Sequence, residues 1–235
     1  MVHITETKRL PAIAKCVEGR TMADIGTDHA YLPIMLCLDS QIDRAIATDI
    51  NRGPLDRAKA HIAAQGLADR IETRLGAGLS TINAGDAACC VVAGMGGLMI
   101  VEMIERDLAV ARSFSKLVLQ PQRDLPEVRR CLLANGFSIE TEQMIVDDGK
   151  FYNILTCRPR IEQEAYTEIE LLFGRHLLRE GSAVLHAWLT SERARVNVIL
   201  TNMRAMPAAN EQAEARAAEL ARYDAICEEA MAWLR

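Results

Sequence analysis

Carboxylates and glycines come directly after two short apolar segments near the start of the chain. Asp24 and Gly26 close the first segment, and Asp49, followed by Ile50, closes the second. A glycine lets the backbone approach a ligand without a Cβ atom, and carboxylates attract positive charge. A carboxylate that ends a second strand can accept hydrogen bonds from both hydroxyls of an adenosine ribose. These residues predict a site for an adenosine that carries a cationic group.

The same residues argue against a pyrophosphate coenzyme. A pyrophosphate is bound by the backbone of a G-x-G-x-x-G turn at a helix N-terminus, and nearby negative charge repels it. That motif is absent here, because the first segment continues as Gly26-Thr27-Asp28-His29. The pattern favours S-adenosylmethionine, whose sulfonium and ammonium groups are positive, over NAD or FAD. A nicotinamide-linked oxidoreductase is the least favoured alternative.

Two further glycine-rich loops are candidates for ligand contact. Gly76 and Gly78 follow a third strand-like segment, 71–75, where small residues leave room for an adenine ring. Gly94, Met95 and Gly96 follow a fourth segment, where the backbone can come very close to a ligand. Ordinary turns and a loop that leads into a helix are the alternative explanations, and the aspartates could instead be helix caps or turn formers.

The segments that position these residues alternate between strand-like and helix-like patterns, which predicts a parallel sheet. Strands are predicted at 21–25, 44–48, 71–75, 87–93 and 116–120, with helices at 30–38, 54–65, 98–105 and 125–134. Strands at 138–146 and 151–157 are joined by a short turn and must be antiparallel. The predicted fold class is α/β, a Rossmann-like class I methyltransferase sheet with one antiparallel strand, over residues 1–160.

Beyond residue 160 the strand signals end and helical periodicity takes over. A helix over about 164–178 precedes two helices whose apolar stripes begin at Leu185 and Ala213 and are interrupted only at Glu192 and Asp224. A turn at 207–210 should fold these two helices against each other. Residues 161–235 are therefore predicted to form a C-terminal antiparallel coiled-coil arm.

Composition limits the location and the partners of the protein. Of its 235 residues, 50% are hydrophobic and 25% are charged, which is ordinary for a chain that buries a full core. The sequence contains neither a membrane-length apolar run nor a signal peptide, so a cytoplasmic protein is expected. The seven cysteines lack metal-ligand spacing and are interpreted as buried thiols, with no metal. The net charge of −5 means that a nucleic acid would need a local basic patch.

Several segments, in order along the chain, closely resemble the bacterial tRNA (adenine-22-N1) methyltransferase family. They are DIGTDHAYLP (24–33), DINRGPLDRA (49–58), RLGAGL (74–79), AGMGG (93–97), LQPQ (119–122) and DDGKFYNI (147–154). The likeness covers about residues 5–158, and the helical arm resembles the coiled-coil extension of that family. It implies a class I fold, S-adenosylmethionine as methyl donor with S-adenosylhomocysteine as product, and an adenine of tRNA as target.

Residues beside the predicted cofactor site are candidates for work on the substrate. Asp28 is the first choice to stabilise the positive charge that a methylated adenine ring acquires, and His29 could orient Asp28 or hydrogen-bond the base. A lone histidine after a strand is more often structural, and Tyr31 could stack on a base or be buried against the sheet. The candidates for substrate contact are Tyr31, Gln120, Gln122 and Arg123.

Two other functions stay open at this point. The acidic chain would suit a methyltransferase of the same class that acts on a small molecule or a protein. A non-catalytic scaffold could combine a degenerate methyltransferase domain with the coiled-coil arm. The sequence indicates no obligate protein partner. It also lacks the D/N-P-P-Y motif after the fourth strand that is typical of enzymes acting on exocyclic adenine nitrogens, which fits chemistry on a ring nitrogen.

Overall fold

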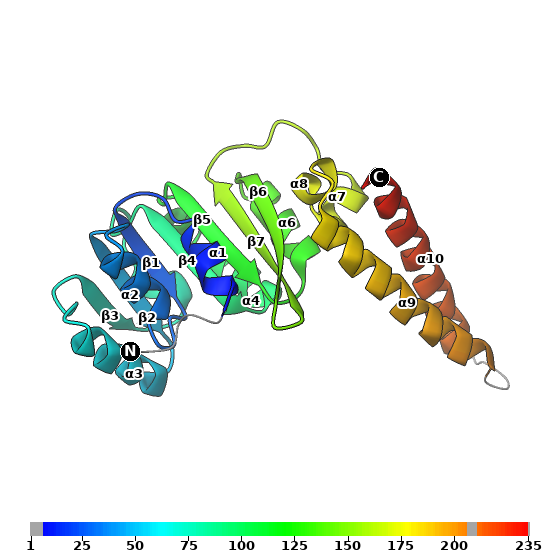
Figure 1. The fold of residues 1–235 in the computed structure, drawn as a ribbon. Helices are drawn as coiled ribbons and strands as arrows, with labels where there is room; N and C mark the ends of the chain where they lie inside the picture. Colours follow the sequence, from blue (N-terminus) through cyan, green and yellow to red (C-terminus); the bar gives the residue numbers. More distant parts are fainter. Residues whose placement is uncertain (1–6, 206–210, 235) are drawn as a thin grey trace. The chain divides into compact units, whose positions relative to one another are not determined.

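A seven-stranded sheet forms the centre of the first of the two units, Met1–Ala165 and Tyr166–Arg235, into which the chain divides (Figure 1). The structure is a computed structural model that describes residues 7–205 and 211–234. Its strands run in the order β3-β2-β1-β4-β5-β7-β6, and only β7 is antiparallel to its neighbours. The predicted fold class is therefore confirmed. The strands are β1 (Thr21–Ile25), β2 (Arg44–Asp49), β3 (Ile71–Leu75), β4 (Cys89–Met95), β5 (Lys116–Pro121), β6 (Ser138–Asp147) and β7 (Lys150–Arg158).

Helices cover the two faces of this sheet, with α1, α2 and α3 on one face and α4 and α6 on the other (Figure 1). Cys89 and Val91 of β4 belong to the core beneath the first group. Strand alternation places Cys90 and Val92 on the opposite face, as expected for the Cys89-Cys90 pair. All seven cysteines are buried free thiols, which confirms that prediction. The helices of this unit are α1 (Arg9–Ala14), α2 (Tyr31–Leu38), α3 (Arg52–Ala64), the 3₁₀ helix η1 (Gly78–Thr81), α4 (Gly97–Arg106), α5 (Leu108–Ala111) and α6 (Leu125–Ala134).

Several elements differ from the prediction. Helices α1 and α5 were not predicted, and α3 begins at Arg52, two residues before the start of the helix predicted at 54–65. The prediction also ended the fourth strand at 93. The register between β4 and β5 shifts between Ala93 and Met95, and this bulge carries the strand past Gly94. The hairpin turn needs only Asp148 and Gly149, which both have positive φ (48° and 70°), as a tight two-residue turn requires.

The second unit is helical throughout its described part, with α7 (Glu168–Phe173), α8 (Arg175–Arg179), α9 (Ala183–Ala205) and α10 (Glu211–Trp233). The single helix predicted over about 164–178 is wrong. Thr167 and Glu170 form a capping box, which starts the helix later, at Glu168. Gly174 then adopts a φ of 95°, outside the helical range, and separates α7 from α8.

Helices α9 and α10 pack antiparallel, as the contacts between them require. Arg193 donates to Asp224 over 2.9 Å, and further along the pair Leu200 packs against Leu220. The residues that interrupt the apolar stripes thus carry polar contacts, because Glu192 likewise accepts hydrogen bonds from Arg195 and Tyr223. The turn predicted at 207–210 lies outside the described residues. None of the described helices combines the length and the apolar composition that crossing a bilayer requires.

Candidate active site

Two adjoining cavities open at the carboxyl ends of the parallel strands. We name them by their acidic residues. The Asp49 cavity measures about 450 Å³ and lies between the ends of β2 and β3 and helix α4. The Asp28 cavity measures about 420 Å³ and lies between the loop after β1 and the ends of β4 and β5. Gly26, Ala93 and Gly94 line both, so the cavities meet where the strand order reverses between β1 and β4. Open α/β sheets bind ligands at this position.

Asp49 is fixed within its cavity by two backbone groups. One carboxylate oxygen accepts the N–H of Asn51 over 2.8 Å, and the other accepts the N–H of Asp28 over 3.3 Å. The side chain is buried, yet each oxygen keeps further acceptor capacity. Among the described residues no basic side chain forms an ion pair with it, so its charge is available to a ligand.

Small and apolar residues form the other walls of the Asp49 cavity. Ile50 is 65% exposed and lies at its rim. Gly78 has a φ of 59°, and a Cβ atom there would lie 2.8 Å from Cγ of Met103. Gly78 is therefore required by the backbone turn and also lines the cavity, while contact of this loop with a ligand stays a prediction. The predicted cofactor residues that line the cavity are Gly26, Asp49, Ile50, Gly76, Gly78, Gly94 and Met95.

Asp24 is a buried carboxyl on the wall of the Asp28 cavity. Its Oδ2 accepts a 2.6 Å hydrogen bond from the hydroxyl of Thr27. Burial raises the pKa of Asp24 to about 6, the Thr27 hydrogen bond opposes this rise, and the negative charge of Asp49 adds to it. No basic side chain in the described part of the chain forms an ion pair with Asp24. The two buried carboxyls therefore repel each other, which favours the binding of a cation nearby.

Asp28 projects toward solvent from a strained position. Its φ is 52°, its side chain is 60% exposed, and Nη2 of Arg57 lies 3.2 Å from its carboxylate. Nε2 of His29 lies 3.5 Å from the other oxygen. The rings of His29, Tyr31 and His61 stack, with centroids 5.2 to 5.4 Å apart. The predicted catalytic pair thus lies together with Tyr31 on one wall of the cavity.

Arg57 and His61 were not singled out from the sequence. They are four residues apart in α3, which places both on the same side of the helix, facing the loop after β1. Arg57 contacts Asp28, and Nδ1 of His61 lies 3.2 Å from the carbonyl oxygen of His29. The four-residue spacing is visible in the sequence, but the loop that the two side chains meet is known only from the fold.

The other predicted substrate residues are divided between cavity and surroundings. Gln122 lines the Asp28 cavity. Gln120 does not, because it is buried and its amide oxygen accepts a 2.9 Å hydrogen bond from Arg9. Arg123 lines neither cavity and is 78% exposed beside Asp124. Gly96 also lies outside both cavities, near the side chain of Arg123.

Arg9 and Tyr152 line the Asp28 cavity as well, although the sequence analysis did not assign them to the site. Arg9 comes from α1 and Tyr152 from β7, and the guanidinium carbon lies 5.7 Å from the centre of the tyrosine ring. Arg9 belongs to no motif, and Tyr152 lies in the segment DDGKFYNI, which by itself gives no sign that the ring meets this cavity. Arg9 reaches the site because α1 packs against the sheet near the end of β6.

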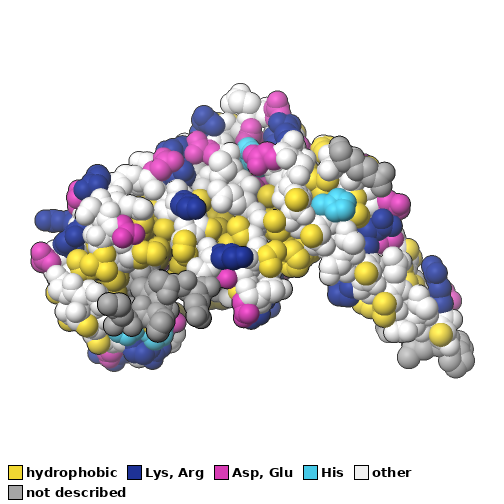
Figure 2. Space-filling model, viewed as in Figure 1, with side chains coloured by type: hydrophobic (Ala, Val, Ile, Leu, Met, Phe, Trp, Pro, Cys, Tyr) yellow, Lys and Arg dark blue, Asp and Glu magenta, His cyan; other side chains and the backbone are white. Residues whose placement is uncertain are grey.

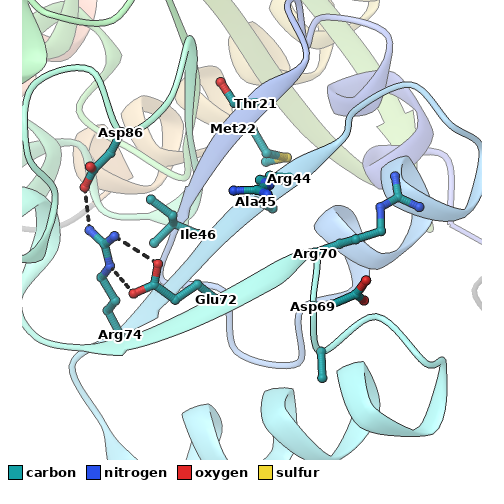
Figure 3. Close-up of a pocket in the computed structure, with 11 residues that line it drawn as sticks. Thr21, Met22, Arg44, Ala45, Ile46, Asp69, Arg70, Glu72, Arg74 and Asp86 are labelled. Atoms are coloured by element: carbon teal, nitrogen blue, oxygen red, sulfur yellow. Dashed lines mark hydrogen bonds and ion pairs between the residues drawn. The ribbon is translucent and has the colours of Figure 1, made fainter.

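A third hollow, of about 350 Å³, lies near the amino ends of β1 and β2, away from this edge (Figure 3). Arg74 lies there between Glu72 and Asp86 and forms ion pairs with both. The hydrogen bonds that Arg74 donates to these two carboxylates, the one to Glu72 first, raise the pKa of Arg74 further above its usual range. The charged groups of this hollow are therefore paired with one another, whereas Asp24 and Asp49 at the carboxyl edge have no ion-pair partner among the described residues. For this reason we place the candidate active site in the two cavities at the carboxyl edge.

Comparison with known sequences gives a consistent result. The model of the tRNA (adenine(22)-N(1))-methyltransferase family matches residues 22–226. The curated tRNA (adenine(22)-N(1))-methyltransferase of Bacillus subtilis (strain 168) is 34% identical over 194 residues, which cover 80% of this chain and 82% of that protein. The match therefore includes both units of the chain.

Solved structures agree with the sequence comparison. A protein from Listeria monocytogenes serotype 4b superposes with a TM-score of 0.91 at 30% identity, over 95% of this chain and 98% of that one. A candidate tRNA (m1A22) methyltransferase from Streptococcus pneumoniae, solved with S-adenosyl-L-methionine, gives a TM-score of 0.84 at 30% identity, with the same coverage. The chain therefore belongs to the tRNA (adenine(22)-N(1))-methyltransferase family.

Proposed function

We propose that the protein transfers a methyl group from S-adenosylmethionine to N1 of the adenine at position 22 of tRNA. The observation that carries the proposal is the pair of buried carboxyls, Asp24 and Asp49, beside the junction of two cavities in a chain of this family. One cavity offers an acceptor for ribose hydroxyls and the other offers room for a base. A pyrophosphate coenzyme would be repelled by the same two carboxyls.

The residues present fit S-adenosylmethionine. Asp49 would accept the ribose hydroxyls, while Ile50, Gly76 and Gly78 would border the adenine. Asp24, at the junction beside Gly26, would face the positively charged amino-acid end. Gly94 and Met95 would lie closest to the transferred group. When bound, the cofactor supplies a methyl group that is activated by the positive sulfur to which it is attached.

The protein residues have to present the target base and stabilise its charge. The lone pair of adenine N1 can attack without prior removal of a proton, so alignment is the main requirement. N1 lies on the Watson–Crick edge, so the base has to leave its helix to enter the Asp28 cavity. The ring becomes positive as the new bond forms, and the carboxylate of Asp28 is placed to stabilise that charge. His29 and Arg57 contact Asp28 and would orient it, and Tyr31 and Gln122 would contact the base.

Charges on the surface suit recognition of tRNA through a few individual contacts. Figure 2 shows basic and acidic side chains interspersed in small groups over the face that carries α1. With a net charge of −5, the chain cannot rely on an overall positive field to attract RNA. Contacts to phosphates would therefore come from single basic residues, and binding should weaken as salt increases. A tRNA substrate also agrees with the cytoplasmic location that was predicted from the sequence.

The target is tested directly with tRNA transcripts. Purified protein, S-adenosylmethionine and tRNA that carries adenine at position 22 should yield N1-methyladenosine at that position, detected by nuclease digestion and mass spectrometry. A transcript with guanine at position 22 is the matched control and should remain unmethylated. Methylation of both transcripts, or of neither, would contradict the proposed target. Methylation of a small molecule or a protein instead of tRNA would favour the alternative acceptor.

The raised pKa of Asp24 leads to a second prediction, about stability. Between the ordinary value of 3.8 and about 6, the folded protein holds a proton at Asp24 that the unfolded chain lacks. This contribution to stability is present at low pH and is lost as the pH rises through about 6. We expect Asp24→Asn, which cannot ionise, to raise the free energy of unfolding at pH 8 by about 1–3 kcal/mol in the absence of ligand. Urea unfolding measures this change, and the gain should shrink as the pH falls below about 6 and disappear below the ordinary value of 3.8.

Ligand binding should respond to Asp24→Asn in the opposite direction. The neutral amide cannot attract a cationic ligand, so the Kd for S-adenosylmethionine should rise at pH 8. In the unmodified protein the affinity should fall below pH 6, by about tenfold per pH unit, as Asp24 becomes protonated. Calorimetry at several pH values measures both effects. A variant that is less stable at pH 8 and binds the ligand normally would show that Asp24 is a structural residue.

A further inference from the structure

Arg9 is held in a fixed position at the wall of the Asp28 cavity. Its backbone N–H donates to Oδ2 of Asp147 over 3.0 Å, at the end of β6. Its Nη1 donates to Oε1 of Gln120 over 2.9 Å, and its guanidinium lies near the ring of Tyr152. The contacts to Asp147 and Gln120 fix both the backbone and the tip of the side chain. A residue used only to cover the surface would not need this support.

The Arg9 guanidinium donates to a neutral partner, and its charge is only partly offset by Asp147, whose pKa is lowered mainly by a hydrogen bond from the backbone of Lys8 and in part by attraction to Arg9. Gln120 is 1% exposed, and its amide nitrogen donates to the carbonyl of Pro121, so its oxygen is turned toward Arg9 as a neutral acceptor. Asp147 accepts the backbone N–H of Arg9. Within residues 7–205 and 211–234, no carboxylate forms an ion pair with the guanidinium. A half-buried positive charge of this kind is stabilised further when an anion binds to it.

The guanidinium also faces the part of the cavity where a ligand would lie. A Cβ atom at Gly94 would lie 3.5 Å from Nη1 of Arg9, so the absence of a side chain at Gly94 leaves the arginine open to the junction of the two cavities. A planar guanidinium binds carboxylate or phosphate oxygens with two parallel hydrogen bonds. The methylated base is itself positive and would be destabilised by direct contact with Arg9. The ligand group is therefore an anion next to the reacting atoms.

We propose that Arg9 binds an oxyanion in the Asp28 cavity, and that buried Gln120 holds the guanidinium in place for it. The proposal rests on the proposed function and extends it, because the reaction offers two such oxyanions. One is the carboxylate at the amino-acid end of S-adenosylmethionine, and the other is a phosphodiester beside the flipped nucleotide. Both would take the same bidentate contact. In the first case, the carboxylate of S-adenosylmethionine would pair with Arg9, while the ammonium group of the same molecule faces Asp24.

Two variants test the charge of Arg9, one by deleting the guanidinium and the other by neutralising it. Arg9→Gln deletes the guanidinium, whereas Gln120→Glu keeps it but places a carboxylate where the neutral oxygen now accepts its hydrogen bond. If Arg9 acts through its charge, both variants should show the same loss of function. If Arg9 only packs, Gln120→Glu should bind its ligands normally. Lys15→Gln, an exposed change near the other end of α1, is the control and should behave like the unmodified protein.

Calorimetry and steady-state kinetics separate the two oxyanions. With the carboxylate as ligand, both variants should bind S-adenosylmethionine with an affinity about 10- to 100-fold lower. Decarboxylated S-adenosylmethionine should bind the variants and the unmodified protein equally well. With the phosphodiester as ligand, the Kd for S-adenosylmethionine should stay the same. The KM for tRNA should then rise about tenfold. A plot of the logarithm of tRNA affinity against the logarithm of salt concentration should become less steep by about one unit of slope.

Specific outcomes would overturn the assignment of Arg9. They are unchanged affinity for both ligands in both variants, normal binding by Gln120→Glu, or an equal loss of S-adenosylmethionine and its decarboxylated form. Unfolding curves of the ligand-free variants show whether α1 stays in place. The proposed function is tested separately, by methylation of tRNA by the unmodified protein. A failure there would leave the calorimetric result for Arg9 standing.

Discussion

Replacing Asp49 with alanine is expected to raise the Kd for S-adenosylmethionine by at least about 100-fold. Two charge-assisted hydrogen bonds to the ribose would be lost, and each contributes about 1.5–3 kcal/mol. The carboxylate is buried and held by the N–H groups of Asn51 and Asp28, so its oxygens are already fixed in position for a ligand. Isothermal titration calorimetry measures the change.

Two companion variants separate ligand contact from loop structure. Asp49→Asn keeps one oxygen for the N–H of Asn51 but removes the charge, so binding should be weakened to an intermediate degree. Asp56→Asn changes an exposed carboxylate on the adjacent α3 and should leave binding unchanged. If Asp49→Ala bound S-adenosylmethionine normally while its unfolding curve was unaltered, the ribose assignment would be wrong.

Several strands were predictable because they are short apolar runs that end at glycine, aspartate or proline. In β1 and β4, local sequence and tertiary structure favour the same conformation, so no long-range information was needed. Asp24 and Asp49 follow directly, since parallel strands bring their carboxyl ends to one edge. Their burial and the raised pKa of Asp24 depend on the packed fold and had no signal in the sequence.

Helix α1 shows where local information ended. Its six residues include Pro11 and are too few to be stable alone. The helix forms because Ile13, which is fully buried, packs into the core beside α2. For the same reason Arg9 could not be placed in the site, because its partner Gln120 lies 111 positions away.

The surroundings of Gln120 and Gly174 could not be read from the sequence, for different physical reasons. Alternation along β5 puts Gln120 on the same face as buried Val118, so its inward direction was predictable, but the helix that it meets was not. Gly174 interrupts an otherwise helical pattern, and a glycine inside a helix costs only about 1 kcal/mol. The sequence therefore permitted one continuous helix, and the observed break depends on packing within the second unit.

Asp28→Asn is expected to lower kcat by about 100- to 1000-fold, the effect of losing a charge placed at a transition state. The Kd for S-adenosylmethionine should change little, because the backbone N–H of residue 28, which supports Asp49, is kept. Asparagine is the right substitution here, since it tolerates the φ of 52° better than alanine does. Single-turnover methylation of tRNA measures the chemical step without interference from product release.

The exposure of Asp28 makes this prediction a stringent one. A carboxylate that is 60% exposed, with Arg57 3.2 Å away, is screened by water and partly neutralised in the free protein. It can stabilise the methylated ring strongly only if tRNA binding excludes that water from the Asp28 cavity.

Asp148→Asn changes an exposed aspartate on the hairpin turn that has a similar φ of 48°, and it controls for the backbone effect of the substitution. A parallel loss of cofactor affinity in Asp28→Asn would assign Asp28 to binding. An unchanged kcat would mean that the backbone around Gly94, and not this carboxylate, faces the developing charge.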